Sequence, residues 1–160
     1  MKNVFLFFLL SSNLICSQIV KEDLIKTHLV KLSSNEMQVR KSGTSGLEKA
    51  AAYIESEFER LGLSKFNGTE SYRQHFKVQG LELFNVLGFL EGKTKPKEIL
   101  VISANYAHLG VNKKLNGDKI FNGDNDDASG ITAVLAIAEH YSFKRTNERS
   151  LLFVAFTAEE

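Results

Sequence analysis

The sequence predicts an α/β domain: a three-layer sandwich in which helices flank both faces of a mixed, centrally parallel sheet. Segments 99–102 and 151–156 are apolar at every position, as expected of strands that are covered on both faces. An alanine-rich apolar helix is expected over 131–141, and the order strand, helix, strand favours a parallel crossover. The alternating stretch 72–78 predicts a half-exposed strand, which we place at an edge of the sheet.

Periodicity and turn residues define the remaining elements. In chain order we expect helix 21–32, helix 47–61, strand 72–78, strand 84–90, strand 99–104, helix 131–141 and strand 151–156. Thr44 or Ser45 can cap the second helix, and Gly62 stands where a helix ends. The turn at 94–97 predicts a hairpin between the strands on either side of it. Because the last strand ends so near Glu160, we expect a domain that is incomplete at its C-terminus, with one face of that strand uncovered.

The N-terminus has the features of a secretory signal. Lys2 precedes the apolar run 4–10, which is too short to span a bilayer. We therefore expect residues 1–17 to be a signal peptide that is removed after Ser17, and residues 18–160 to form the N-terminal part of one domain. The predicted location is secreted or periplasmic.

Composition limits the other classes of function. Cys16 is the only cysteine, so cleavage after the signal would leave no disulfide and no cysteine-ligated zinc. Lipid anchoring at Cys16 is the alternative that we favour less, because Ile15 is bulky where such signals have a small residue. The net charge of +1 argues against a nucleic-acid partner. The sequence predicts no membrane span and leaves the oligomeric state open.

Three polar segments follow or join the predicted strands at the edge of the sheet where α/β proteins build their sites. They are 104–110, 122–130 and 157–160. Taken singly, each has an ordinary explanation. The carboxylates of 122–130 can cap the next helix, and the two final glutamates can be exposed loop residues. A calcium loop of the EF-hand type is excluded, because the required glycine and distal glutamate are absent.

Taken together, the three segments resemble the co-catalytic zinc aminopeptidases (clan MH), which include secreted bacterial leucyl aminopeptidases and glutamate carboxypeptidase. The family signature runs His-x-Asp-His-Leu-Gly, then Asn-Gly-Ala-Asp-Asp-Asn-Ala-Ser-Gly at a helix start, then a strand that ends in Glu-Glu. Here the order, spacing and flanking strands match, and the upstream run 32–37 with Arg40 and 43–46 is also similar. The resemblance implies a zinc-peptidase-like fold, two zinc ions and a peptide substrate.

Position by position, the resemblance implies three site residues. Asp126 corresponds to the aspartate that bridges the metals, Glu159 to the general base and Glu160 to a zinc ligand. The chain departs from the family at Asn105, which stands in place of the first histidine ligand, and at Ala107, in place of an aspartate. An amide is a much poorer zinc ligand than an imidazole.

Two further positions belong to the same comparison. Asn125 replaces the aspartate that usually precedes the bridging one, and His108 matches a histidine that is not a primary ligand. Three interpretations remain open. The chain is an aminopeptidase homologue with impaired or absent activity, a non-catalytic binding ectodomain of the same fold, or a single-zinc relative of the glutaminyl cyclase type, which is an acyltransferase. Metal content distinguishes them: two zinc ions, none or one.

Overall fold

The computed structural model describes residues 20–109 and 123–159. The expected signal peptide 1–17 and the lipid-anchor alternative at Cys16 lie outside this part of the chain and stay predictions. None of the helices in the described part has both the length and the apolar character needed to cross a bilayer.

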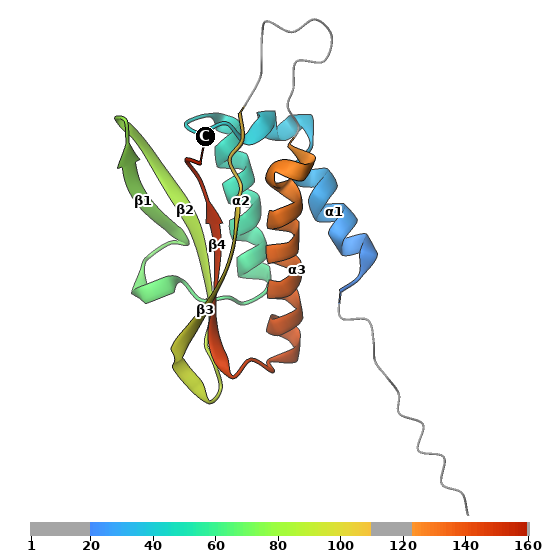
Figure 1. Cartoon of the computed structure of the whole chain (residues 1–160), viewed down its shortest axis with the longest axis vertical. Coiled ribbons are helices and arrows are strands. Elements are labelled where there is room, and N and C mark those ends of the chain that lie inside the picture. Colours follow the sequence, from blue (N-terminus) through green and yellow to red (C-terminus); the bar gives the residue numbers. More distant parts are fainter. Residues whose placement is uncertain (1–19, 110–122, 160) are drawn as a thin grey trace, which may run out of the picture.

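A mixed four-stranded sheet packs against a layer of helices (Figure 1). The strand order is β1-β2-β4-β3. The main elements are α1 (Glu22–Leu32), α2 (Ser45–Arg60), β1 (Arg73–Val78), β2 (Leu81–Leu90), β3 (Lys95–Asn105), α3 (Ser129–Lys144) and β4 (Arg149–Phe156). Strands β1 and β2 are antiparallel, as are β2 and β4, whereas β3 and β4 are parallel. The predicted α/β class with a mixed sheet and the parallel crossover are confirmed.

The core lies between the sheet and helices α2 and α3. The apolar stripe of α2 predicted from its spacing is buried, and Phe58 in the last turn of the helix is fully inaccessible. Phe58 lies beside Phe153 of β4, with ring centroids 6.5 Å apart. Helix α3 adds Leu135 and Ala138 to the same cluster. Large aromatic surfaces of this kind dominate the apolar burial of a domain, and here they fix α2 over the centre of the sheet.

Arg73 joins the edge strand β1 to helix α2. Its guanidinium pairs with Glu55 at 2.7 Å and with Glu48 at 2.8 Å, and it stacks over the ring of Phe84 at 4.1 Å from the centroid. The planar guanidinium suits paired carboxylates and aromatic faces at once. The predicted edge strand is confirmed, because β1 pairs only with β2 in the described sheet. Arg73 also connects this edge strand to the helical layer by ion pairs.

Three sequence-based expectations need correction. The hairpin across 94–97 is wrong, because β4 lies between β2 and β3. The strand over 99–102 is not central: in the described sheet β3 is an edge, and Ile99, Leu100 and Val101 are 45%, 54% and 53% exposed. Conversely, the interior residues of β4, expected to have an uncovered face, are buried. β4 is fully apolar over 151–156 and gains most from the central position, since it pairs along both edges there.

Helices α1, α2 and α3 lie on one face of the sheet (Figure 1). The other face carries a small cluster of Leu87, Leu152 and Val154, against which Phe66 and Phe89 pack. The second helical layer of the expected three-layer sandwich is not found within residues 20–109 and 123–159.

Candidate functional site

The three polar segments meet where the parallel strands end. Asn105, the last residue of β3, is the register partner of Phe156 at the end of β4, so the residues that follow each strand emerge side by side. The acidic segment forms an irregular helical turn, Asp124–Ala128, directly before α3. Its backbone leaves helical geometry at Asp126 and Asp127, and the peptide bond between these two residues is cis. The described parts of the three segments therefore lie together at this edge of the sheet, where the sequence placed the candidate site.

Asp127 connects the acidic turn to its neighbours. One carboxylate oxygen accepts a hydrogen bond from the Gly130 amide at 2.8 Å, and the other accepts one from the Asn105 amide at 3.2 Å. The first bond satisfies an amide at the start of α3 that lacks a partner within the helix, which is the usual role of a capping carboxylate. The second bond fixes the turn against the end of β3.

Asn105 and Glu159 are in direct contact. The side-chain amide of Asn105 donates a hydrogen bond to a carboxylate oxygen of Glu159. The position that the family resemblance gives to a metal-binding histidine is therefore occupied by a donor directed at the expected general base. Sequence comparison identified both positions but gave no indication of this bond.

Asp126 lies on the other side of the turn, near His108. Its carboxylate oxygen is 3.6 Å from His108 Nδ1. The Asp126 side chain is 65% exposed, whereas that of His108 is 8% exposed. Ala107, which replaces the family's aspartate, is buried. The expected bridging carboxylate is thus accessible from solvent, but the structure pairs it with His108 and not with an imidazole at position 105.

Tyr106 fixes the end of β3 through two hydrogen bonds. Its amide donates to the Phe156 carbonyl and its hydroxyl donates to the Phe84 carbonyl, both at 2.9 Å. Burial raises the pKa of the Tyr106 hydroxyl above its ordinary value, so the hydroxyl remains a donor. The tyrosine thereby fixes the ends of β3 and β4 relative to β2 without taking part in the polar site itself.

Arg40 is the site residue whose role the sequence did not reveal. It was noted only as part of the family resemblance, yet its guanidinium is buried under the acidic turn and donates to the Gly123 carbonyl at 3.0 Å. These two residues are 83 positions apart in the chain. No local spacing signals a contact over that distance, so only the folded chain reveals it.

Part of the expected site lies outside the described residues. Glu160, expected to bind zinc, is one such residue, as is segment 110–122. Among the residues that the structure does describe, no three His, Cys, Asp or Glu side chains are grouped as metal ligands. The described residues therefore do not fit the metal centre of a zinc peptidase.

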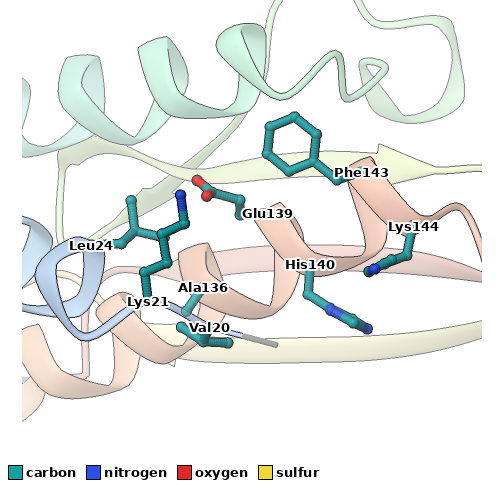
Figure 2. Close-up of a pocket in the computed structure, with 8 residues that line it drawn as sticks. All are labelled: Val20, Lys21, Leu24, Ala136, Glu139, His140, Phe143 and Lys144. Carbon is teal, nitrogen blue, oxygen red and sulfur yellow. The ribbon is translucent and has the colours of Figure 1, made fainter. Parts of the chain in front are cut away.

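A cavity of about 210 Å³ lies elsewhere, between the start of α1 and the last turns of α3 (Figure 2). Lys21, Glu139, His140 and Lys144 are among its lining residues. The acidic turn joins α3 at the opposite end of this helix. The cavity is thus separate from the candidate site.

Comparisons with known proteins support the assignment made from the motifs. Residues 85–160 match the sequence model of peptidase family M28. No curated protein matches the chain. The fold is shared with a glutaminyl cyclase from Fimbriiglobus ruber, at a TM-score of 0.71 and 23% identity over 88% of this chain and 46% of that one.

Two further solved structures share the fold. A leucine aminopeptidase precursor from Bacteroides thetaiotaomicron has a TM-score of 0.65 and 19% identity, covering 88% of this chain and 48% of its own. A Zn-dependent exopeptidase from Parabacteroides distasonis has a TM-score of 0.64 and 18% identity, covering 88% and 47%. The chain thus spans about half the length of these structures.

These findings confirm the resemblance predicted from the sequence. The chain carries the peptidase family M28 pattern over residues 85–160, on a fold found in zinc-dependent exopeptidases, aminopeptidases and glutaminyl cyclases.

Proposed function

We propose that this chain is a metallopeptidase-family protein of the aminopeptidase type whose own aminopeptidase activity is impaired or absent. The observation that carries the proposal is the hydrogen bond from the Asn105 amide to the Glu159 carboxylate. Hydrolysis of N-terminal peptide bonds in the family depends on zinc and on a base that removes a proton from water. In this chain the side chain of Asn105 affects both zinc binding and the base, Glu159.

The effect on the base follows from hydrogen bonding. A general base must present a free lone pair to the proton that it removes. The Asn105 amide donates to Glu159, so a lone pair of this carboxylate is already engaged. Glu159 remains the residue to which we assign the catalytic role, but the contact reduces its ability to act as the base.

The effect on metal binding follows from ligand chemistry. Zinc in catalytic sites is held by imidazole and carboxylate groups, and a neutral amide oxygen is a weak substitute. Position 105 offers such an amide, and position 107 offers a buried alanine methyl group instead of the carboxylate that would orient an imidazole. Asp126 and Glu160 are the positions that we propose for contact with metal, and zinc is the metal named for an exopeptidase of the same fold.

Metal analysis and a peptidase assay test the proposal together. The purified chain should contain far less than one equivalent of zinc after dialysis. It should release no nitroaniline from aminoacyl nitroanilides above the background of the matched Glu159→Ala variant. Cleavage that is abolished by a chelator and absent from Glu159→Ala would overturn the proposal.

A glutaminyl cyclase is the second candidate, because several solved structures that share this fold are glutaminyl cyclases, with TM-scores of 0.65 to 0.71. This acyl-transfer activity would release ammonia from a peptide with N-terminal glutamine, which mass spectrometry detects as a loss of about 17 Da. One equivalent of zinc together with this mass loss would favour the cyclase. A lack of both zinc and activity is expected for the proposed inactive peptidase homologue and for a non-catalytic binding domain alike, so that outcome would exclude only the cyclase.

A further inference from the structure

Arg40 is a charged side chain in the interior of the protein. It is the last residue of a short helical segment, Asn35–Arg40, and is 1% exposed. Its backbone has a φ of 54°, a conformation that is uncommon for a residue with a side chain. A charge is rarely buried so completely unless it is paired and hydrogen-bonded. The structure therefore has to provide partners for it.

The guanidinium contacts three segments that are distant in sequence. It donates to the carbonyls of Leu32 at 2.5 Å, Tyr106 at 3.0 Å and Gly123 at 3.0 Å. These residues belong to the end of α1, the segment after β3 and the start of the acidic turn. A rigid fork with five donors is suited to several acceptors at fixed angles.

The backbone of Arg40 adds to this connection. Its carbonyl accepts a hydrogen bond from the His108 amide at 3.2 Å. The Gly123 carbonyl also accepts from the Ala128 amide at 3.1 Å, so Arg40 contacts the acceptor that closes the acidic turn. A Cβ atom at Gly123 would lie 2.6 Å from Arg40 Nη2. The close approach leaves no room for a side chain between the turn and the guanidinium.

Three carboxylates act on the charge of Arg40. Burial lowers the pKa of the guanidinium from its ordinary value, and the charges of Asp124, Asp127 and Asp126 oppose this change, in decreasing order. An arginine remains protonated in proteins even when its pKa is lowered. The acidic turn therefore lies against a permanent internal cation.

We propose that Arg40 is a positioning residue that holds the acidic turn 123–128 against the end of β3 and supplies its counter-charge, so that the turn is ordered without bound metal. Bringing three aspartates together is unfavourable unless a cation offsets their repulsion. In a metal centre the ion itself has that role. Here the chain provides a cation of its own.

This inference is independent of the proposed function. A turn held by Arg40 is compatible with a protein that binds zinc and with one that does not. Measuring zinc in every sample keeps the two apart. Bound zinc bears on the proposed function, whereas a turn that loses its order when metal is removed bears on Arg40.

Hydrogen exchange of the Ala128 and Gly130 amides reports on the turn, because both are bonded within it. We expect their protection in the unmodified chain to be the same with and without a chelator. In Arg40→Met these amides should exchange about tenfold faster or more, as for a lost charged hydrogen bond. The α2 amides of the same sample are the internal reference. Arg40→Lys, which keeps the charge, should restore part of the protection.

A second substitution separates counter-charge from simple packing. Adding Asp124→Asn to Arg40→Met should restore protection of the turn, because it removes a carboxylate that has lost its cation. Asp23→Asn, on the exposed side of α1, is the matched control and should restore nothing. Equal effects of the two asparagine substitutions would overturn the counter-charge role. If Arg40→Met does not fold, loss of protection in the unmodified chain on chelation would by itself overturn the proposal.

Discussion

Asn105 and Ala107 allow the metal-binding capacity of the site to be tested at single residues. We expect Asn105→His combined with Ala107→Asp to raise zinc affinity by about 10–100-fold, since an imidazole replaces an amide and the new carboxylate can orient it. The substitution also removes the donor that contacts Glu159. Competition for zinc against a chromogenic chelator measures the change.

Asn105→Gln is the control for this experiment, because it alters the side-chain length but keeps the amide. Its zinc affinity should equal that of the unmodified chain. Of the two variants, only the double substitution is expected to raise zinc affinity. An unchanged zinc affinity would show that position 105 does not face the metal site.

His28 should make the stability of the protein depend on pH. It is 2% exposed; its Nδ1 bonds the Tyr53 hydroxyl at 2.6 Å, and its Nε2 has no hydrogen-bond partner in the described part of the chain. Burial lowers the pKa of His28 below its ordinary value, Glu57 and Glu139 act to raise it, and Arg60 acts to lower it.

The sign follows from this direction. The unfolded chain binds a proton at His28 at a higher pH than the folded chain does. The contribution of His28 to the free energy of unfolding is therefore complete above about pH 6.5. It decreases as the pH falls toward the lowered pKa of the folded state, by at most about 1.4 kcal/mol per pH unit. Urea unfolding between pH 7 and pH 5 should show this decrease. It should be smaller in His28→Gln and unchanged in His75→Gln, at an exposed site on β1.

The sequence placed several candidate residues at one edge of the sheet but gave no indication of their contacts. Asn105, Asp126 and Glu159 were placed at one edge of the sheet because parallel strands end together. The Asn105–Glu159 bond depends on side-chain conformation, which spacing does not encode. Arg40 reaches Gly123 across 83 residues, so its role emerges only when α1, β3 and the turn are packed together.

At the scale of elements, the close packing of β2 against α2 requires a residue without a side chain at Gly88. A Cβ atom at Gly88 would lie 2.7 Å from Phe58 Cδ2 and 2.8 Å from Leu63 Cδ1. Gly88→Ala should therefore destabilise the protein by about 1–3 kcal/mol, the usual cost of overpacking a core. Phe58→Leu, which makes space at the same contact, should also destabilise it when introduced alone.

A double-mutant cycle tests whether the two residues are coupled. In Gly88→Ala with Phe58→Leu, the total loss in free energy of unfolding should be smaller than the sum of the single losses, because the smaller side chain accommodates the added methyl group. Additive losses in urea unfolding would contradict the proposed steric contact.

The elements themselves were largely predictable, but their order in the sheet was not. The observed helix α2, Ser45–Arg60, and strand β4, Arg149–Phe156, agree with the periodicity to within two residues at each end. The patterns of 99–102 and 151–156 are equally apolar, so the sequence could not indicate which strand is central. Strand order depends on long-range pairing, and the local turn at 94–97 gave a misleading indication of a hairpin.

At the scale of the whole molecule, β3 presents an apolar edge. Ile99 and Val101 share one face of the strand because alternate residues point the same way, and they are 45% and 53% exposed. Exposed strand edges and apolar patches promote association. We expect the isolated chain to form oligomers or aggregates, which size-exclusion chromatography with light scattering would detect.

Ile99→Thr with Val101→Thr should reduce this association, because threonine keeps the strand preference and removes apolar surface. Val30→Thr, at an exposed site on α1, is the control and should have little effect. A chain that is monomeric and melts in one sharp transition would contradict the prediction.

Export of the protein is a prediction from the sequence alone. Lys2 and the apolar run 4–10 should direct secretion and cleavage near Ser17. Mass spectrometry of the exported protein should find an N-terminus close to Gln18. Cytosolic protein that retains Met1 would show that the segment is not a signal peptide.

The central place of β4 bears on how the chain acquires its structure during synthesis. β4 pairs with β2 and with β3, its register partners being about 50–70 residues earlier in the sequence. Pairings over such distances form slowly, and domains fold as their segments leave the ribosome. A nascent chain that has reached residue 148 can form α2 and the β1–β2 pair, but β3 has no neighbouring strand. The apolar surfaces of β2 and β3 would then remain open until β4 emerges, which makes this interval the period of greatest dependence on a chaperone.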